Sequence, residues 1–223
     1  MASKEFAWSY SKLKNFETCP KRHLEVDLLK NFAEKAEPGG PLDWGNRLHD
    51  AMKVALLGSG RLPDEFIQYQ PWVDKITDGA GHLYVEQKYA ITRDFRKTSW
   101  FGADVWYRGI GDAVRVDGPV ALVVDWKTGK VLEDHAQLML MAQCIFSHFP
   151  EVQRVRSEYI WLKFDTTTGH VYDRQEVADE WNGMFNRVAE LELAHKVQSY
   201  PPKPGKLCRN WCPVQSCPHW KKG

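Results

Sequence analysis

The chain has 223 residues, a hydrophobic share of 43% and a formal net charge of +1. This length fits one domain, or one domain with an appended lobe. The near-neutral charge argues against a protein that coats nucleic acid without specificity. No stretch of about 18 apolar residues and no apolar signal-peptide region occur, so we expect a cytoplasmic protein without a membrane span.

Hydrophobic periodicity and turn residues predict a chain in which helices and strands alternate. The helices are expected at residues 9–30, with a break at Pro20, and at 42–57, 64–78, 134–148 and 176–197. The strands are expected at residues 83–92, 109–116, 119–127 and 156–164. This order predicts an α/β fold in which helices flank a central mixed sheet.

The most informative pattern lies on a predicted β-hairpin, whose strands read GIGDAVRV and PVALVVDWK. The Asp-Gly pair between them is a strong signal for a two-residue turn. Such a turn would pair Val116 with Pro119 and would place Asp112 opposite Val123. Because side chains alternate between the two faces of a strand, this register decides which residues share a face with Asp112.

In this register Asp112, Asp125 and Lys127 share one face, and the two carboxylates are diagonal neighbours roughly 7–8 Å apart. Two carboxylates at that spacing can hold Mg²⁺, which prefers oxygen ligands. A nearby ammonium can orient an attacking water. The apolar run around Asp125 indicates a buried strand, where an unpaired charge is costly. The alternative is a solvated or salt-bridged hairpin without catalytic chemistry.

Two further polar residues are candidates for a site. His49 lies one turn after Gly45 on the predicted helix 42–57, where the alternative is a core histidine beside an apolar stripe. Glu86, in the strand LYVEQKY, is either a carboxylate that supports the metal ligands or binds a second cation, or a surface glutamate paired with Lys88. Neither pattern decides between its two interpretations.

Three cysteines near the C-terminus, Cys208, Cys212 and Cys217, lie on a turn-rich segment that is typical of a metal site. A fourth ligand could come from Cys19 or His219. Spacing alone does not distinguish zinc from an iron–sulfur cluster. An odd cysteine count with three clustered residues fits a reducing compartment better than a disulfide framework.

The ordered motifs resemble the PD-(D/E)xK nucleases, and most closely their RecB-like exonuclease branch. That branch includes CRISPR-associated and phage-encoded iron–sulfur nucleases, and the ending CRNWCPVQSCPHW is most similar to the phage-encoded members. The residues that carry the resemblance are Cys19-Pro20, Gly45-x-x-x-His49, Gly111-Asp112, Asp125-Trp126-Lys127, Gln137, Cys208, Cys212 and Cys217.

The resemblance implies a restriction-endonuclease-like core and a set of site residues. The cation, Mn²⁺ or Mg²⁺, would be held by His49, Asp112, Asp125 and the Trp126 backbone carbonyl. Lys127 would orient the attacking water, and Gln137 would steady it or the phosphate. Asp134-x-x-Gln137 also fits a capping box, which is purely structural. Relatives often carry a tyrosine four residues after this glutamine, where this chain has Met141.

The resemblance also implies that Cys19, Cys208, Cys212 and Cys217 hold a structural 4Fe–4S cluster, with zinc as the alternative. Residues 1–40 and 200–223 would then form a cluster lobe beside a nuclease core over residues 41–199, within a single nuclease domain. We expect loss of the cluster to cause loss of folding rather than loss of chemistry.

The function that these expectations predict is a metal-dependent DNA exonuclease acting on single strands or DNA ends. The resemblance places it in phage recombination or DNA processing, in the host bacterial cytoplasm, with recombination or CRISPR-related proteins as partners and room for an oligomer. Two alternatives stay open. One is a catalytically silent nucleic-acid-binding or adaptor protein, and the other is a zinc-stabilised structural protein.

Contact with DNA is expected near the chain ends. Trp8, Trp211 and Trp220 are candidates for stacking on bases of a single strand. Basic residues of the first helix and of the cysteine segment would add a charged rim, although such groups are most often a solvated face.

Overall fold

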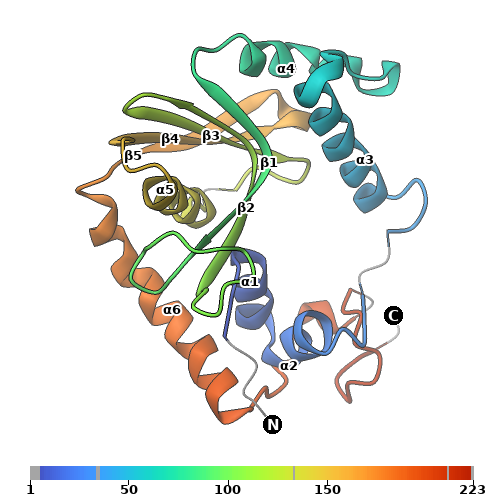
Figure 1. Cartoon of the computed structure of the whole chain (residues 1–223). Helices are drawn as coiled ribbons and strands as arrows, with labels where there is room; N and C mark the ends of the chain where they lie inside the picture. The colour runs from blue at the N-terminus through green and yellow to red at the C-terminus, as the bar shows by residue number, and fades with distance from the viewer. Residues whose placement is uncertain (1–5, 34–35, 133, 210, 222–223) are drawn as a thin grey trace. The chain divides into compact units, whose positions relative to one another are not determined.

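The computed structural model describes residues 6–33, 36–132, 134–209 and 211–221 (Figure 1). The chain forms two compact units. One comprises Met1–Lys35 together with Asn182–Gly223, and the other is Ala36–Trp181. Whether these units fold as the single nuclease domain expected from the sequence stays a prediction.

The unit over residues 36–181 is built on a five-stranded sheet in the order β1-β2-β3-β4-β5. The strands are β1 (His82–Ile91), β2 (Tyr107–Asp117), β3 (Val120–Lys127), β4 (Arg154–Trp161) and β5 (Thr166–Asp173). Only β3 and β4 run parallel, and the other neighbours are antiparallel. This confirms the predicted α/β fold with a mixed sheet.

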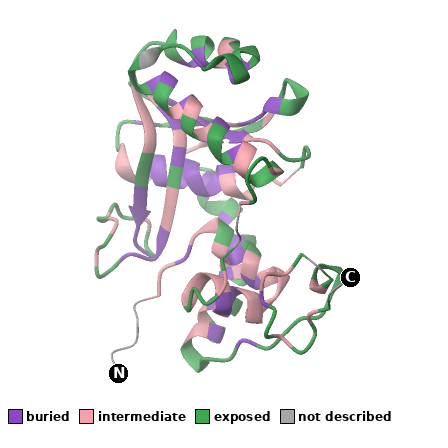
Figure 2. Ribbon diagram, turned by 90° about the vertical axis from the view of Figure 1, so that its right-hand side faces the viewer, coloured by how far each residue is buried: buried purple, intermediate pink, exposed green. Residues whose placement is uncertain are grey.

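The helices of this unit lie on both faces of the sheet (Figure 1). Helix α5 (Ala136–His148) makes the crossover between the parallel strands and is buried throughout residues 138–146. It appears almost entirely as a buried element in Figure 2. On the other face, α3 (Pro41–Val54) and α4 (Gln70–Thr77) pack with Ala113, Val124 and Trp126 in a second apolar core.

The remaining helical segments are short, except for α6. They are α1 (Tyr10–Thr18), α2 (Pro20–His23), η1 (Leu24–Leu28), η2 (Ala55–Ser59), η3 (Asp64–Tyr69), η4 (Leu162–Phe164), α6 (Val177–Val197) and η5 (Lys206–Cys208). Proline at the first position of α2 explains the predicted break there. None of the helices that the structure describes is long and apolar enough to cross a membrane.

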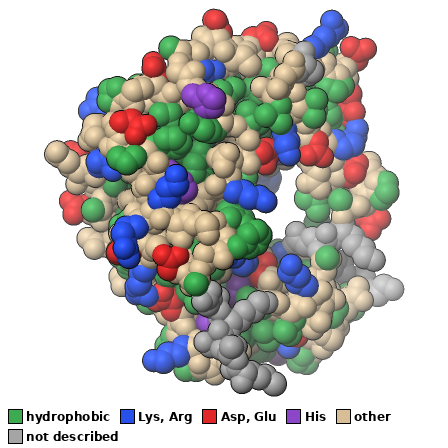
Figure 3. Space-filling view, viewed as in Figure 1, with side chains coloured by type: hydrophobic (Ala, Val, Ile, Leu, Met, Phe, Trp, Pro, Cys, Tyr) green, Lys and Arg blue, Asp and Glu red, His purple; other side chains and the backbone are tan. Residues whose placement is uncertain are grey.

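In the unit with both chain ends, α1 buries its side chains Leu13 and Phe16. Arg187 of α6 makes two hydrogen bonds to the carboxylate of Glu17, with N–O distances of 2.6 and 3.0 Å. Trp8 is only 1% exposed, so its predicted availability for stacking on a base is wrong. On the face shown in Figure 3, basic, acidic and hydrophobic side chains intermingle, as the near-neutral net charge leads one to expect.

The register of the β2–β3 hairpin differs from the predicted one by two residues. Asp117 pairs with Val120, so the turn residues are Gly118 and Pro119 rather than the Asp-Gly pair. Gly118 has φ +53°, a left-handed conformation that favours glycine. The ladder ends at Ala113 and Val124. Continued by one residue, this register would set Asp112 opposite Asp125 instead of diagonal to it.

Strand β5 was not predicted from the sequence. It returns from β4 through Asp165, whose φ of +46° makes a tight turn without glycine or proline. The strand reads TTTGHVYD, which is polar and interrupted by Gly169. A Cβ on Gly169 would lie 2.4 Å from the Ser157 carbonyl oxygen of β4, so this edge of the sheet requires glycine.

This close approach yields a prediction about stability. Gly169→Ala should lower the free energy of unfolding by about 1–3 kcal/mol, because the new methyl group would press on fixed backbone. Gly183→Ala on α6 is the matched control, since a Cβ there meets nothing within 4 Å. It should stabilise the helix by up to about 1 kcal/mol. Thermal melts followed by circular dichroism would measure both, and equal melting temperatures would contradict the packing at β4–β5.

Candidate active site

Asp112 is the central residue of the candidate site. It lies on β2 at the point where pairing with β3 stops, and its side chain is 14% exposed. One carboxylate oxygen, Oδ2, accepts a hydrogen bond of 2.9 Å from the backbone N–H of Trp126. The same oxygen lies 3.7 Å from Nδ1 of His49. Asp112 is thus held by the neighbouring strand and faces the imidazole of α3.

Three side chains can hold a metal ion together. One ligand atom each from His49, Glu86 and Asp112 lies within 4.8 Å of the others, and all three residues are half-buried. They come from α3, β1 and β2, so three separate elements meet at this point. This spacing places Glu86 among the candidate ligands themselves.

Glu86 has a backbone conformation that is rare for its residue type. Its φ is +51°, in the left-handed region. The β1–β2 ladder pairs Val85 with Ala113 and Gln87 with Gly111, but it omits the pair between Glu86 and Asp112. Strained residues in the middle of a strand persist only where the surroundings enforce them, and they cluster at functional sites.

Asp125 belongs to an adjoining network rather than to the three-residue set. The Lys127 ammonium lies 2.7 Å from Oδ1 of Asp125 and donates to the Gln137 amide oxygen at 3.1 Å. The Gln137 amide nitrogen donates to Oδ2 of Asp125 at 2.5 Å. Gln137 therefore binds both groups through its side chain, whereas Asp134 accepts a hydrogen bond from the backbone N–H of Ala136. The predicted capping box is wrong.

Tyr159 is a neighbour of this network that sequence reasoning missed. It pairs with Asp125 across the parallel β3–β4 ladder, and its ring centroid lies 5.0 Å from the Lys127 nitrogen. The aromatic face stabilises the ammonium and limits its movement. Only the register of β4 places this tyrosine there, so no local motif could have identified it.

The electrostatics of the site favour a bound cation. Burial raises the pKa of Asp112 well above its usual range, and the carboxylates of Asp125 and Glu86 raise it further, while the Trp126 N–H opposes the shift. Burial lowers the pKa of His49, so its imidazole is neutral near pH 7 and can offer a lone pair to a metal. A bound cation would favour the ionised form of Asp112, which burial disfavours.

Gly45 has a packing role. A Cβ at this position would lie 3.1 Å from the hydroxyl oxygen of Thr128, the residue that follows β3. The absence of a side chain lets α3 approach the end of β3, and this approach brings His49 to the carboxylates. Gly45 therefore makes room for Thr128 of the same chain.

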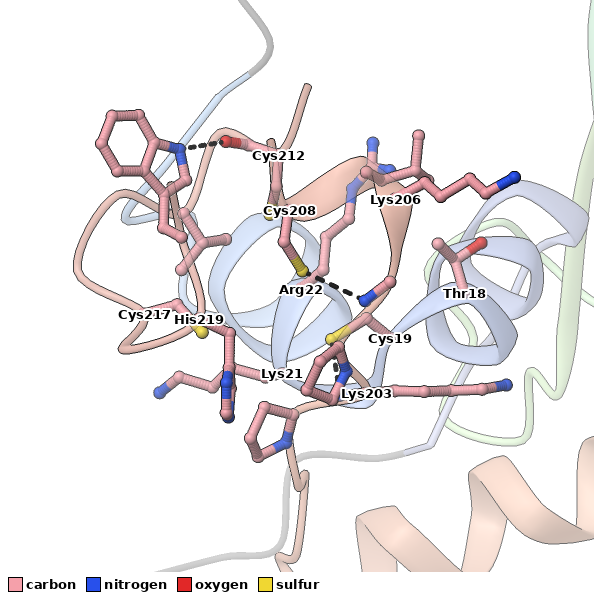
Figure 4. A pocket seen from close by; sticks show the side chains of 16 residues that line it. Thr18, Cys19, Lys21, Arg22, Lys203, Lys206, Cys208, Cys212, Cys217 and His219 are labelled. Carbon is pink, nitrogen blue, oxygen red and sulfur yellow. Dashed lines mark hydrogen bonds between the residues drawn. The ribbon is translucent and has the colours of Figure 1, made fainter. Parts of the chain in front are cut away.

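A second candidate site lies in the unit with both chain ends (Figure 4). Cys19, Cys208, Cys212, Cys217 and His219 line one pocket of about 190 Å³. Burial raises the pKa of the Cys212 thiol. Backbone N–H groups of Lys203 and Gly205 donate to the sulfurs of Cys19 and Cys208 at 3.3 and 3.4 Å. The four sequence-predicted thiols thus meet at one pocket, whereas Cys144 is fully buried in α5.

Comparison with known proteins identifies the class of this fold and site. The profile of the PD-(D/E)XK nuclease superfamily matches residues 7–218, so the chain belongs to that superfamily. A solved structure named "Putative exonuclease" from Eubacterium rectale is similar over 95% of this chain and 88% of its own, with 14% identity and a TM-score of 0.54. The structure of SSO0001 matches 100% of this chain and 91% of its own at 14% identity and a TM-score of 0.49. None of the curated proteins matches the sequence.

The raised pKa of Asp112 predicts how pH affects the cation-free protein. The folded state keeps this proton at pH values where the unfolded chain has lost it, because an unperturbed aspartate has a pKa of about 3.9. Stability should therefore fall as pH rises from that value through the raised pKa. We expect Asp112→Asn to remove this fall and to raise the melting temperature in EDTA at neutral pH.

The matched control for this prediction is Asp64→Asn, since the Asp64 side chain is 97% exposed. It should melt like the wild type across the pH series. Adding Mn²⁺ should stabilise the wild type and the control but leave Asp112→Asn unchanged. A pH profile for Asp112→Asn that runs parallel to the wild type would contradict the buried-carboxylate description.

Proposed function

We propose that the protein is a metal-dependent DNA exonuclease that hydrolyses phosphodiester bonds on single strands or DNA ends. The observation that carries the proposal is the meeting of His49, Glu86 and Asp112 beside the network of Asp125, Lys127 and Gln137. This arrangement occurs in a chain of the PD-(D/E)XK nuclease superfamily.

The residues present fit a divalent cation with hard ligands. Two carboxylates and one imidazole suit Mg²⁺ or Mn²⁺, and the imidazole favours Mn²⁺. We propose His49, Asp112 and Glu86 as ligands on the basis of their spacing. Asp125 and the Trp126 carbonyl are proposed as further ligands on the resemblance to related nucleases. When bound, the cation would lower the pKa of its water and stabilise charge on the phosphoryl oxygen.

The other side chains of the site would position the reacting groups. The Lys127 ammonium, oriented by Asp125, Gln137 and Tyr159, would hold the attacking water and counter the charge that develops on the phosphate. Gln137 uses its amide nitrogen and its carbonyl oxygen to set the distance between the carboxylate and the ammonium. Such prior orientation reduces the reorganisation needed during the reaction.

The finer assignment follows from resemblance. RecB-like relatives favour an exonuclease of 5′→3′ polarity in phage recombination or DNA processing, and the name of the similar Eubacterium rectale structure is compatible with an exonuclease. We propose the bacterial cytoplasm as the place of action, as the cysteine usage suggests.

We also propose that the four-cysteine pocket holds a 4Fe–4S cluster. Four thiols are the usual ligands of such clusters, and Cys19, Cys208, Cys212 and Cys217 line one pocket from two distant parts of the sequence. The side chains of Lys21, Arg22, Lys203 and Lys206 line the same pocket and would offset the negative charge of a thiolate-bound cluster. Zinc is the alternative occupant.

The nuclease proposal makes a direct prediction. Asp125→Ala and Lys127→Ala should each reduce cleavage of labelled DNA in Mn²⁺ by at least about 100-fold, because positioned proton-transfer and orienting groups contribute about 10²–10⁴-fold. EDTA should stop the wild-type reaction. Products from 5′- and 3′-labelled strands would show the polarity.

Lys75→Ala is the control for Lys127→Ala, since the Lys75 ammonium also lies over an aromatic ring, 5.2 Å from the Trp72 centroid. It should keep wild-type activity. Circular dichroism would show whether each variant is folded. A folded Lys127→Ala variant with full activity would refute the assignment of the site.

The cluster proposal is tested by the metal itself. Protein purified without oxygen should show a visible absorption band and contain about four irons and four sulfides per chain. Zinc has filled d orbitals and would give a colourless protein. Cys217→Ser should lose the metal and unfold at a lower temperature, whereas Cys144→Ser should retain it because that thiol lies in the α5 core. Metal content unchanged in Cys217→Ser would exclude this pocket.

A further inference from the structure

The connection between β1 and β2 carries an exposed aromatic side chain. Phe101 is 85% exposed, the highest value for a large hydrophobic residue in the described segments. Its neighbour Trp100 is half-buried. Leaving a phenylalanine ring in water forgoes the free energy that burial would supply. Single exposed hydrophobic residues are common on protein surfaces, so the neighbours of Phe101 decide what its exposure means.

Basic groups surround this aromatic pair. The guanidinium of Arg108 lies 5.7 Å from the Trp100 ring centroid and 6.0 Å from that of Phe101, and the Lys88 ammonium lies 5.4 Å from Trp100. Arg108 also donates a hydrogen bond of 2.7 Å from Nε to the carbonyl oxygen of Trp100. The rings are therefore anchored to β2 by a charged side chain.

The same hairpin is strongly basic, in contrast to the near-neutral chain. Residues 88–108 contain five basic residues, Lys88, Arg93, Arg96, Lys97 and Arg108, and two acidic residues, Asp94 and Asp104. Five positive and two negative charges give +3 within 21 residues, compared with +1 for all 223. Such a local excess of positive charge attracts phosphate groups.

The connection between β1 and β2, residues 92–106, is called the tip of the hairpin here. The two strands link this tip to the carboxylates. Lys88 pairs with Ile110, two residues along the ladder from Glu86 and Asp112. Ala90 pairs with Arg108, two residues further. At about 3.3 Å per residue, the base of the tip lies about 13 Å from the candidate cation site along the strands.

The orientation of these side chains also fits. Gly109 faces α5, because a Cβ there would lie 2.7 Å from the Met141 sulfur. Since side chains alternate, Arg108 and Ile110 point to the other face of the sheet, where α3 brings His49. Ile110 is 42% exposed, so this strip of the sheet is open to solvent.

We propose that the β1–β2 tip is a stacking platform for an unpaired base of the nucleic acid that enters the site. Phe101 would stack on the base, and Lys88 and Arg108 would contact the flanking phosphates. The inference rests on the proposed nuclease function and makes it more specific. Because a base in a duplex already stacks on its neighbours, the platform would select single-stranded segments.

Binding of fluorescent oligonucleotides in EDTA, measured by anisotropy, tests the proposal without cleavage. Phe101→Ala and Phe101→Leu should bind a single strand at least fivefold more weakly than the wild type, whereas Phe101→Trp should bind within twofold of it. Leucine keeps the hydrophobicity but lacks the ring face, so this pair separates stacking from simple apolar contact. Affinity for a blunt duplex should stay within twofold in all three variants.

The matched control is Phe164→Ala, which removes another exposed ring, 54% accessible, from the segment after β4. It should bind single strands like the wild type. Lys88→Gln should in addition reduce the slope of log affinity against log salt by about 0.7, as expected for one lost phosphate contact with a single strand. Wild-type single-strand affinity in Phe101→Ala, or an equal loss on the duplex, would overturn the platform.

A small substrate separates this proposal from the function on which it rests. Bis(4-nitrophenyl) phosphate can reach the cation site without touching the tip. If the wild type hydrolyses it in Mn²⁺ and Phe101→Ala does so at the same rate, the nuclease centre is intact and the binding data judge the platform alone. If the wild type cleaves neither this ester nor DNA, the nuclease function itself fails, and the platform fails with it.

Discussion

The buried carboxyl group of Asp112 is the constraint on which the rest of the site depends. Burial and two nearby carboxylates raise the pKa of this group, and a bound cation would stabilise its ionised form. The surrounding residues position this carboxyl group and its neighbours. The Trp126 N–H fixes one oxygen, Gly45 allows α3 to bring His49 close, and Glu86 adds a second carboxylate within 4.8 Å. Lys127 is kept apart from this group by its own partners, Asp125 and Gln137.

Much of the fold could be predicted because apolar periodicity marks the helices and strands directly. The hairpin that carries Asp112 and Asp125 was also predictable, although its turn was misplaced. Asp-Gly and Gly-Pro are both plausible turn pairs, and only the full ladder decides between them. Strand β5 escaped prediction because its polar sequence is held by pairing with β4, a contact distant from any local signal. Tyr159 escaped for the same reason.

The composition of the two sites was easier to predict than their geometry. Motif order pointed to the cysteines and to His49, but it gave no reason to separate Asp125 from the three-residue set or to include Glu86 in it. The left-handed backbone of Glu86 depends on its neighbours and has no signature in the sequence. Contact with DNA was expected at tryptophans near the chain ends. Trp8 is core, whereas Trp211 is 78% exposed, and in the described residues Phe101 is exposed further still. A single aromatic residue in a sequence does not reveal whether its side chain is buried or exposed.

The missing pair between Glu86 and Asp112 divides the β1–β2 ladder into an inner and an outer part. The two carboxylates therefore lie at the interruption in the ladder. An ion bound by both carboxylates would connect the two strands where the ladder lacks a pair. It would thereby hold the outer part of the hairpin, with its aromatic tip, in place.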